Sequence, residues 1–244
     1  MTRRDGRKNN MMREVLIQPN FVKFPHGSVL ISYGDTKVIC TVMIEEKIPP
    51  FLLEKNPAQG WMTAEYSILP GAGHVRNPRP GYGNNQLKGR VHEVQRMIGR
   101  ALRAAVDLKK IGPRTLMIDC DVLQADGGTR TAAITGTMVA VELAIQKMLK
   151  DGKIAENPIK TNVAAVSVGI LSNEIILDLD YLEDSSAETD TNIVMTREGG
   201  LIEVQGTAEH GAFSKSQLDQ MLEIGQDAIR NLFALQDRAL GKNR

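Results

Sequence analysis

The sequence is poor in cysteine, in aromatic residues and in net charge. Its two cysteines, Cys40 and Cys120, lie in apolar, strand-like runs, which excludes a disulfide framework or a cysteine metal site and favours a reduced, cytoplasmic protein. Aromatic residues make up 4% of the chain, with a single tryptophan, which argues against a surface that binds bases mainly by stacking. Because the net charge is +1, any nucleic-acid binding must depend on a local cluster of positive charge.

Long apolar runs are missing as well. No uninterrupted apolar span has the length of a membrane helix, and the N-terminus lacks the apolar segment of a signal peptide. We therefore expect a soluble, cytoplasmic protein with no membrane partner. Residues 1–14 are polar and contain Arg3, Arg4, Arg7, Lys8 and Arg13, so we expect a solvated or frayed terminus.

The chain does contain enough apolar residues to build a substantial core. Hydrophobic residues make up 42% of its 244 residues and charged residues 24%, as in ordinary globular proteins. The hydrophobic periodicity predicts strands within 15–46, 61–67, 115–124 and 163–207, and the last of these regions is expected to be a four-stranded meander. A loop is predicted at 48–56. Helices are predicted at 89–107, at 132–150 and from 214 onward. This order predicts an α+β fold, one domain over 1–244 with an N-terminal part of about 1–152 and a C-terminal part of about 158–240.

One stretch, Asp126–Thr131, combines a glycine pair with the start of an apolar helix. It follows the strand-like run 115–124. Free backbone N–H groups and the positive end of a helix dipole attract anions, and Thr129 and Arg130 add a hydroxyl and a planar cation suited to phosphate. A tight turn with a plain helix cap explains the pattern equally well, and both interpretations stay open.

The next candidate segment is a long loop that contains two arginines and precedes a third. The region 71–87 is rich in Gly, Pro and Asn, and a loop of this length is usually functional or disordered. Its Arg76 and Arg79 are either solvated loop charges or clamps on a flexible phosphate polymer. Arg90 opens the helix after this loop, where a ligand can reach it.

Acidic residues form two groups. Asp119 and Asp121 share one face of the strand 115–124, where structural hydrogen bonds or ion pairs are favoured over a metal site. The link 182–190 holds four acids, Glu183, Asp184, Glu188 and Asp190. Such a link is either a solvated acidic loop or, beside an anion site, a Mg²⁺-binding part of a phosphoryl-transfer centre.

A series of strings also occurs in one order along nearly the whole chain. They are Arg4–Arg7, Gly27–Leu30, Asp35–Cys40, Trp61–Ser67, Glu93–Ala104, Ile118–Thr131, Glu183–Glu188 and Val204–Glu209. In these strings the chain resembles the bacterial RNase PH family of phosphate-dependent exoribonucleases, which act on tRNA 3′ ends. Polynucleotide phosphorylase and exosome ring subunits share the fold but match the strings less closely.

The resemblance implies a fold of the ribosomal protein S5 domain 2 type and a set of site residues. Phosphate would be bound by Arg90, Gly128, Thr129 and Arg130. Asp184 and Asp190 would be the catalytic residues associated with Mg²⁺. Arg76 and Arg79 would hold the RNA, and the partners would be tRNA 3′ ends and other structured RNA, with a homohexamer built as a trimer of dimers.

One segment departs from the family pattern. The family usually has Leu-Pro-Arg-Ala-Thr where this chain has Leu69-Pro-Gly-Ala-Gly73, so an arginine and a threonine are replaced by Gly71 and Gly73. The loop that follows also contains Pro78, Pro80, Gly81 and Gly83 and is one residue longer. Two hypotheses follow: weaker binding of the RNA tail, or compensation by the two arginines of this loop.

The implied reaction is phosphorolysis, in which inorganic phosphate attacks the last phosphodiester and releases a nucleoside diphosphate; the reverse reaction adds nucleotides. Whether Asp190 binds metal or acts as a general acid stays open. A metal-dependent hydrolytic exonuclease is one alternative, and it would not need the anion site at 128–130. The other is a non-catalytic RNA-binding ring subunit, which predicts loss of Asp184, Asp190 or Arg130, and all three are present.

Overall fold

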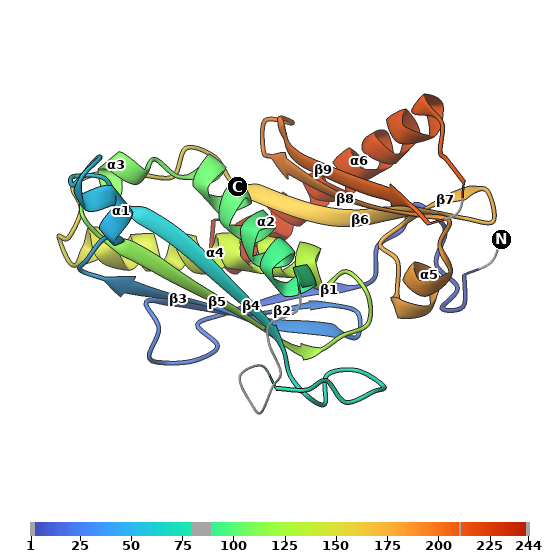
Figure 1. Ribbon diagram of the computed structural model, residues 1–244, viewed down its shortest axis with the longest axis horizontal. Helices are drawn as coiled ribbons and strands as arrows, with labels where there is room; N and C mark the ends of the chain where they lie inside the picture. Colours follow the sequence, from blue (N-terminus) through green and yellow to red (C-terminus); the bar gives the residue numbers. More distant parts are fainter. Residues whose placement is uncertain (1–2, 80–88, 210, 243–244) are drawn as a thin grey trace.

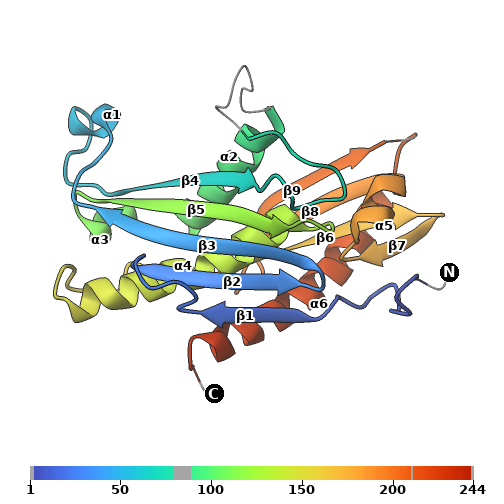
Figure 2. The ribbon, with the colours of Figure 1, turned by 90° about the horizontal axis from the view of Figure 1, so that it is seen from below.

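Two β-sheets with helices between and beside them form the molecule in the computed structural model, which describes residues 3–79, 89–209 and 211–242 (Figure 1). The first sheet has five strands in the order β1-β2-β3-β5-β4. Their bounds are β1 Val15–Pro19, β2 Gly27–Tyr33, β3 Thr36–Glu45, β4 Trp61–Ile68 and β5 Thr115–Gln124. Only the β4–β5 pair within this sheet is parallel, so the sheet is mixed (Figure 2).

The second sheet corrects the predicted meander. Its strands, β6 Val163–Leu171, β7 Glu174–Leu177, β8 Thr189–Thr196 and β9 Leu201–Ala208, are all antiparallel but run in the order β7-β6-β8-β9. The chain leaves the short strand β7 through the helix α5, Tyr181–Ser186, and returns on the other side of β6. The strands were predicted correctly, whereas the order expected of a simple meander was wrong.

The helix α4, Thr129–Lys150, lies between the two sheets (Figure 1). It contacts β2 and β3 on one side and β6 on the other, as the apolar pattern of this segment predicted. Its length and composition also satisfy the criteria for a membrane span, but 78% of the apolar window is buried inside the molecule. A buried core helix has the same composition.

The remaining helices surround this centre. They are α1 Pro50–Leu53, α2 Gly89–Ala105, α3 Leu108–Ile111 and α6 Lys215–Ala239. The capping box predicted at Ser214 and Gln217 is present in α6. The segment 48–56 was predicted as a loop, but it contains the single turn α1, because Pro50 at the first helical position fits a helix start.

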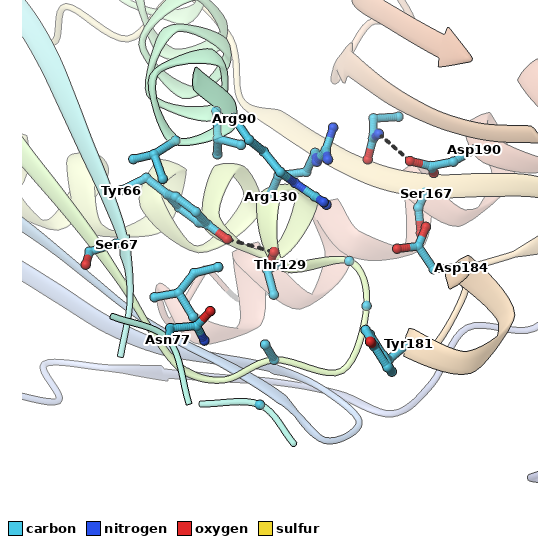
Figure 3. A pocket seen from close by; sticks show the side chains of 18 of the residues that line it. Tyr66, Ser67, Asn77, Arg90, Thr129, Arg130, Ser167, Tyr181, Asp184 and Asp190 are labelled. Carbon is cyan, nitrogen blue, oxygen red and sulfur yellow. Dashed lines mark hydrogen bonds between the residues drawn. The ribbon is translucent and has the colours of Figure 1, made fainter. Parts of the chain in front are cut away.

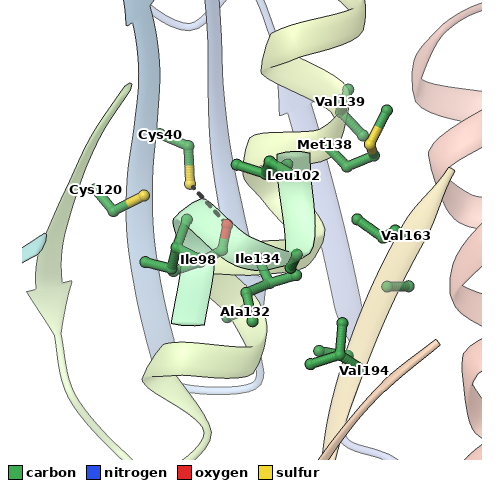
Figure 4. Close-up of a cluster of buried hydrophobic side chains, with 14 of the residues drawn as sticks. Cys40, Ile98, Leu102, Cys120, Ala132, Ile134, Met138, Val139, Val163 and Val194 are labelled. Atoms are coloured by element: carbon green, nitrogen blue, oxygen red, sulfur yellow. Dashed lines mark hydrogen bonds between the residues drawn. The ribbon is translucent and has the colours of Figure 1, made fainter. Parts of the chain in front are cut away.

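The core joins both sheets to α4 and α2. Figure 4 shows Ile98 and Leu102 of α2 packed with Ile134 of α4, and Val163 and Val194 of the second sheet close by. Cys40 and Cys120 are buried free thiols on neighbouring strands. They are apolar core residues, as their positions in strand-like runs predicted.

The prediction of a frayed N-terminus is wrong. Arg3 and Arg13 are 5% and 8% exposed. Arg3 Nε donates to Glu183 Oε1 at 2.7 Å, and Arg13 Nη2 donates to Asp178 Oδ1 at 2.7 Å. Arg3 and Arg13 therefore pair with buried acids far along the chain, which the local composition does not reveal.

The expected pairing of Asp119 and Asp121 is also not found. They lie on one face of β5, opposite the buried face, and no described group hydrogen-bonds or ion-pairs with either carboxylate. Burial and the nearby Glu65 raise the pKa of both aspartates. These acids therefore lie together on the sheet without neutralising partners among the residues described.

Candidate active site

The turn before α4 is held in a conformation that suits glycine. Gly127 and Gly128 have φ angles of 73° and 65°, a left-handed region that other residues rarely adopt. A side chain at Gly127 would also place its Cβ 2.7 Å from the carbonyl carbon of Asp180. Thr36 Oγ1 donates to Gly127 O at 2.6 Å and accepts from Asp126 N at 3.0 Å, so hydrogen bonds to the body of the protein fix the turn.

This turn presents the N-terminus of α4 to a pocket. Gly128 is the N-cap, and it supplies no side-chain cap. Thr131 Oγ1 donates to Gly128 O at 2.9 Å, which directs that hydroxyl back to the turn. Because Tyr66 OH donates to Thr129 Oγ1 at 2.8 Å, the hydroxyl hydrogen of Thr129 is free to donate to a ligand. Backbone N–H groups and a hydroxyl at the positive end of a helix form an anion-binding arrangement.

Two arginines line the same pocket from the first turns of two helices. Arg90 is the second residue of α2, and Arg130 is the second residue of α4. The Arg130 side chain is mostly buried and lies 3.9 Å from Glu93 Oε1 and 3.5 Å from Gln205 Oε1. Both long contacts leave the guanidinium free to bind a stronger anion, as a planar fork binds phosphate. Figure 3 shows both side chains extending into the pocket.

Asp184 of α5 and Asp190 of the second sheet face the arginines across the pocket (Figure 3). Asp184 lies on α5, which a capping box of Asp180 and Glu183 stabilises, and Asp190 lies on β8. Asp190 Oδ2 accepts a 3.4 Å hydrogen bond from Asn192 Nδ2, whereas its Oδ1 is buried and has no described hydrogen-bond partner. Burial, and then the charge of Asp184, raise the pKa of Asp190 to about 6. Burial also raises the pKa of Asp184, against the opposing effect of Arg90 and Arg130.

The predicted phosphate residues and the predicted aspartates therefore lie around one space. The cavity has a volume of about 570 Å³, and its lining includes Arg90, Gly128, Thr129, Arg130, Asp184 and Asp190. A cationic side built on α2 and α4 faces an acidic side built on α5 and β8. Such a cavity suits a phosphate ester together with a hydrated cation.

The carboxylate pair fits Mg²⁺ better than a metal that needs a full set of protein ligands. The described residues contain no group of three or more His, Cys, Asp and Glu side chains able to hold a metal ion. Mg²⁺ needs only one or two carboxylates, because it keeps several waters and uses phosphate oxygens. The buried Oδ1 of Asp190, which no described group satisfies, is one donor atom of the required type.

The loop arginines lie apart from this cavity. Arg76 and Arg79 are exposed, and neither lines the cavity, although His74, Asn77 and Pro78 of the same loop do. Gly71 is also exposed, and a Cβ added there would meet no atom within 4 Å. Pro80, Gly81 and Gly83 of this loop lie outside the described residues.

Several lining residues were not predicted. Tyr66, Ser167, Tyr181 and Asn192 also line the cavity. Asn192 follows Asp190 by two positions on one strand, so strand periodicity could have indicated it. Ser167 faces the cavity only because β6 pairs with β8 in a particular register, and the sequence does not reveal that register.

The two other acids of the link 182–190 have different surroundings. Glu183 is buried, and the ion pair with Arg3 lowers its pKa against the effect of burial. Glu188 accepts a 3.3 Å hydrogen bond from Asn173 N and does not line the cavity. Within this link, only Asp184 and Asp190 contribute carboxylates to the cavity.

The sequence model of the 3′ exoribonuclease family, domain 1, matches residues 11–145, and that of domain 2 matches residues 161–228. A similar protein is the Ribonuclease PH of Syntrophomonas wolfei, 54% identical over 241 residues, which are 99% of this chain and 100% of that protein.

Solved structures with a similar fold are more distant in sequence. Rice (Oryza sativa) Rrp46 has a TM-score of 0.78 at 21% identity, with 98% of this chain and 100% of that chain covered. The Archaeoglobus fulgidus exosome with RNA bound to the active site has a TM-score of 0.79 at 22% identity, with 95% and 91% covered. An archaeal exosome core has a TM-score of 0.73 at 20% identity, with 97% and 90% covered. At this identity the likeness shows the fold.

Proposed function

Because the chain belongs to the 3′ exoribonuclease family and is a phosphorolytic 3′-to-5′ exoribonuclease of the ribonuclease PH type, we propose that it trims the 3′ ends of tRNA precursors and other structured RNA. One observation supports this site: the turn residues Gly128 to Arg130 and the pair Asp184 and Asp190 line the same cavity. A hydrolytic exonuclease uses water as the nucleophile and does not need an anion site at 128–130 for an attacking phosphate.

In the proposed reaction, an oxygen of inorganic phosphate attacks the phosphorus of the last phosphodiester. The bond from that phosphorus to the preceding 3′-oxygen breaks, and a nucleoside diphosphate leaves. Arg130, Arg90 and the N–H groups near Thr129 bind and orient the attacking phosphate. The nucleophile comes from solution, so the protein contributes position and charge rather than a nucleophilic side chain. The reverse reaction transfers a nucleotide from a diphosphate to the RNA.

Asp184 and Asp190 would hold Mg²⁺, which when bound supplies positive charge to the reacting phosphoryl oxygens. Asp190 has a second role open to it, because a carboxyl with a pKa of about 6 is partly protonated near neutral pH and can give a proton to the leaving 3′-oxygen. The pH profile separates the two: a general acid gives a rate that falls above its pKa, and a metal ligand gives a rate that rises through it.

The deciding experiment uses a tRNA with extra 3′ nucleotides, incubated with Mg²⁺ and with or without phosphate. We expect nucleoside diphosphates that appear only when phosphate is added. Asp184→Asn should abolish their release, whereas Glu188→Gln, in the same link but outside the cavity, should leave it unchanged. Nucleoside monophosphates formed without phosphate would instead support the hydrolytic alternative, and binding without any product would support the non-catalytic one.

We further propose that Arg76 and Arg79 hold the RNA tail, and that Gly71 weakens this grip relative to the arginine usual in the family. Open space around Gly71 means that a larger side chain fits there. Filter binding of tRNA to Gly71→Arg should show tighter binding than wild type. Unchanged affinity would reject the hypothesis that Gly71 weakens RNA binding. The hypothesis that Arg76 and Arg79 compensate for the missing arginine would then remain.

The proposed assembly is a homohexamer, a trimer of dimers, in the cytoplasm. Light scattering after size-exclusion chromatography should then give six times the chain mass of 26.8 kDa. A species of one or two chains at micromolar concentration would reject the hexamer.

A further inference from the structure

Ser167 is a buried hydroxyl that the proposed mechanism does not use. It lies on β6, is 4% exposed and lines the cavity of the candidate site. Its Oγ is fully buried and has no hydrogen-bond partner among the described groups. A buried hydroxyl without a partner destabilises a protein, so such groups are uncommon in native folds and require an explanation.

The β6–β8 register places this hydroxyl on the same sheet face as Asp190. Ser167 pairs with Asn192, and Gly169 pairs with Asp190. Residues paired across antiparallel strands share a face, as do residues two apart on one strand. Ser167, Asn192 and Asp190 therefore form one polar patch on the cavity wall. Figure 3 labels two of its members, Ser167 and Asp190.

Unsatisfied buried groups are concentrated at this patch. The described part of the chain has four buried side-chain polar atoms without a partner, and two of them, Ser167 Oγ and Asp190 Oδ1, belong to residues that line this cavity. Buried hydroxyls elsewhere are satisfied: Ser28 Oγ donates to Val22 O at 2.9 Å, and Tyr33 OH donates to Thr135 Oγ1 at 3.0 Å. The missing partner is thus a property of the cavity wall, not of buried hydroxyls throughout the fold.

We propose that Ser167 is a further substrate-binding residue, whose hydroxyl donates a hydrogen bond to an oxygen of the phosphate held by Arg130. The inference rests on the proposed function of the same site. Phosphate oxygens accept hydrogen bonds and a serine hydroxyl can donate one. Arg90, Arg130 and Asn192, which line the same cavity, are also donors to such an anion. The carboxylates of Asp184 and Asp190 in the same lining would face the phosphate through the Mg²⁺ that they would hold.

Ser167→Ala tests the assignment, because it removes a hydroxyl that stabilises nothing in the free protein. We expect kcat/KM for phosphate, measured at saturating RNA and Mg²⁺, to fall by about tenfold to a hundredfold, the loss typical of one hydrogen bond to a charged group. The midpoint of thermal unfolding should be unchanged or higher. Calorimetric titration of phosphate without Mg²⁺ and RNA should show weaker binding to the variant.

Ser28→Ala is the matched control, since Ser28 is a buried strand serine outside the cavity whose hydroxyl has partners. It should show the reverse: a lower unfolding midpoint and unchanged kcat/KM for phosphate. The assignment is overturned if Ser167→Ala leaves phosphate binding and kcat/KM unchanged, lowers the unfolding midpoint as Ser28→Ala does, or alters only the Mg²⁺ dependence. Failure of the proposed function is distinguishable, because wild type would then release no diphosphates on adding phosphate.

Discussion

At the scale of single residues, the charged form of Asp190 lowers the stability of the folded protein. Its carboxyl is buried beside Asp184 and lacks a described partner for Oδ1. Burial disfavours the charged form and so raises the pKa. A carboxyl whose pKa is higher in the folded than in the unfolded state gives up stability as pH rises, because the folded protein must release a proton that it holds more tightly.

The upward direction of this pKa shift predicts how stability depends on pH. With a folded pKa of about 6, the stabilising contribution of protonated Asp190 is complete below its unfolded pKa and is lost as pH rises through 6. Asp190→Asn removes the ionisation, so it should stabilise the protein without Mg²⁺ or phosphate at pH 8 by about 3 kcal/mol. The gain should shrink toward pH 4. Urea unfolding at pH 8, 6 and 4 measures it.

The functional cost should appear in the same variant. Asp190→Asn should be inactive in phosphorolysis, and Mg²⁺ with phosphate should stabilise it less than they stabilise wild type. Equal stability of variant and wild type at all three pH values would contradict the raised pKa, whatever the effect on activity.

Sequence reasoning reached some of these residues but not others. The Gly127–Gly128 turn and Asp184 are recognisable because each lies within a contiguous string of family residues, and Asp190 follows the string that holds Asp184 by two positions. Ser167 and Tyr66 each come from a separate strand and reach the cavity only through tertiary packing. For Asp119 and Asp121, strand periodicity correctly predicts that they share one face of a strand. It does not predict that they lack partners in the described structure, because that depends on which strands lie beside them.

At the scale of elements, the N-terminal segment connects the two sides of the site. Arg13 donates to Asp126 O, at the turn before α4, and to Asp178 Oδ1 at 2.7 Å, in the link before α5. Arg3 donates to Glu183 of α5 at 2.7 Å. The segment therefore holds the Gly127–Gly128 turn and the helix that carries Asp184, although local composition alone predicted a solvated or frayed terminus.

Substitutions of Arg3 and of its neighbour Arg4 test whether the N-terminal segment holds α5 in place. Arg3→Ala leaves the buried carboxylate of Glu183 without its main partner, and removing one member of a buried pair costs about 3–5 kcal/mol. Because Glu183 is adjacent to Asp184, we also expect kcat to fall. Thermal or urea unfolding and the phosphorolysis rate measure the two effects.

Arg4→Ala is the control, because Arg4 is the next residue and is exposed. Its effect on the free energy of unfolding should lie within about 0.5 kcal/mol, as for ordinary surface substitutions. Similar losses of stability in the two variants would show that the ion pair with Glu183 does not hold the segment in place.

At the scale of the whole molecule, α4 is the element that both sheets share. Of its 22 residues, 15 are buried, and it contacts β2, β3 and β6. Close approach depends on glycine: a side chain at Gly27 of β2 would overlap Ala140 O, and a Cβ at Gly136 would lie 2.7 Å from Ile31 Cγ2. The apolar helix pattern predicted a buried α4, whereas the β7-β6-β8-β9 order could not be predicted, because strand periodicity does not specify neighbours.

This shared core bears on the proposal that residues 1–244 form one domain. If either sheet unfolded alone, it would expose one apolar side of α4 to water, and burial of apolar surface contributes about 25 cal/mol per Å². The cavity would also be lost, since its cationic side is built on α2 and α4 and its acidic side on α5 and β8.

We therefore expect a single cooperative unfolding transition. Fluorescence of Trp61, which reports on β4 of the first sheet, should change at the same urea concentration as protection of β6 amides from hydrogen exchange, which reports on the second sheet. Repeating the titration at several protein concentrations separates dissociation of an assembly from unfolding of the chain. Loss of β6 protection while Trp61 remains native would instead mean that the first sheet holds α4 alone, and that the two halves matched by the family models are separate folding units joined at the active site.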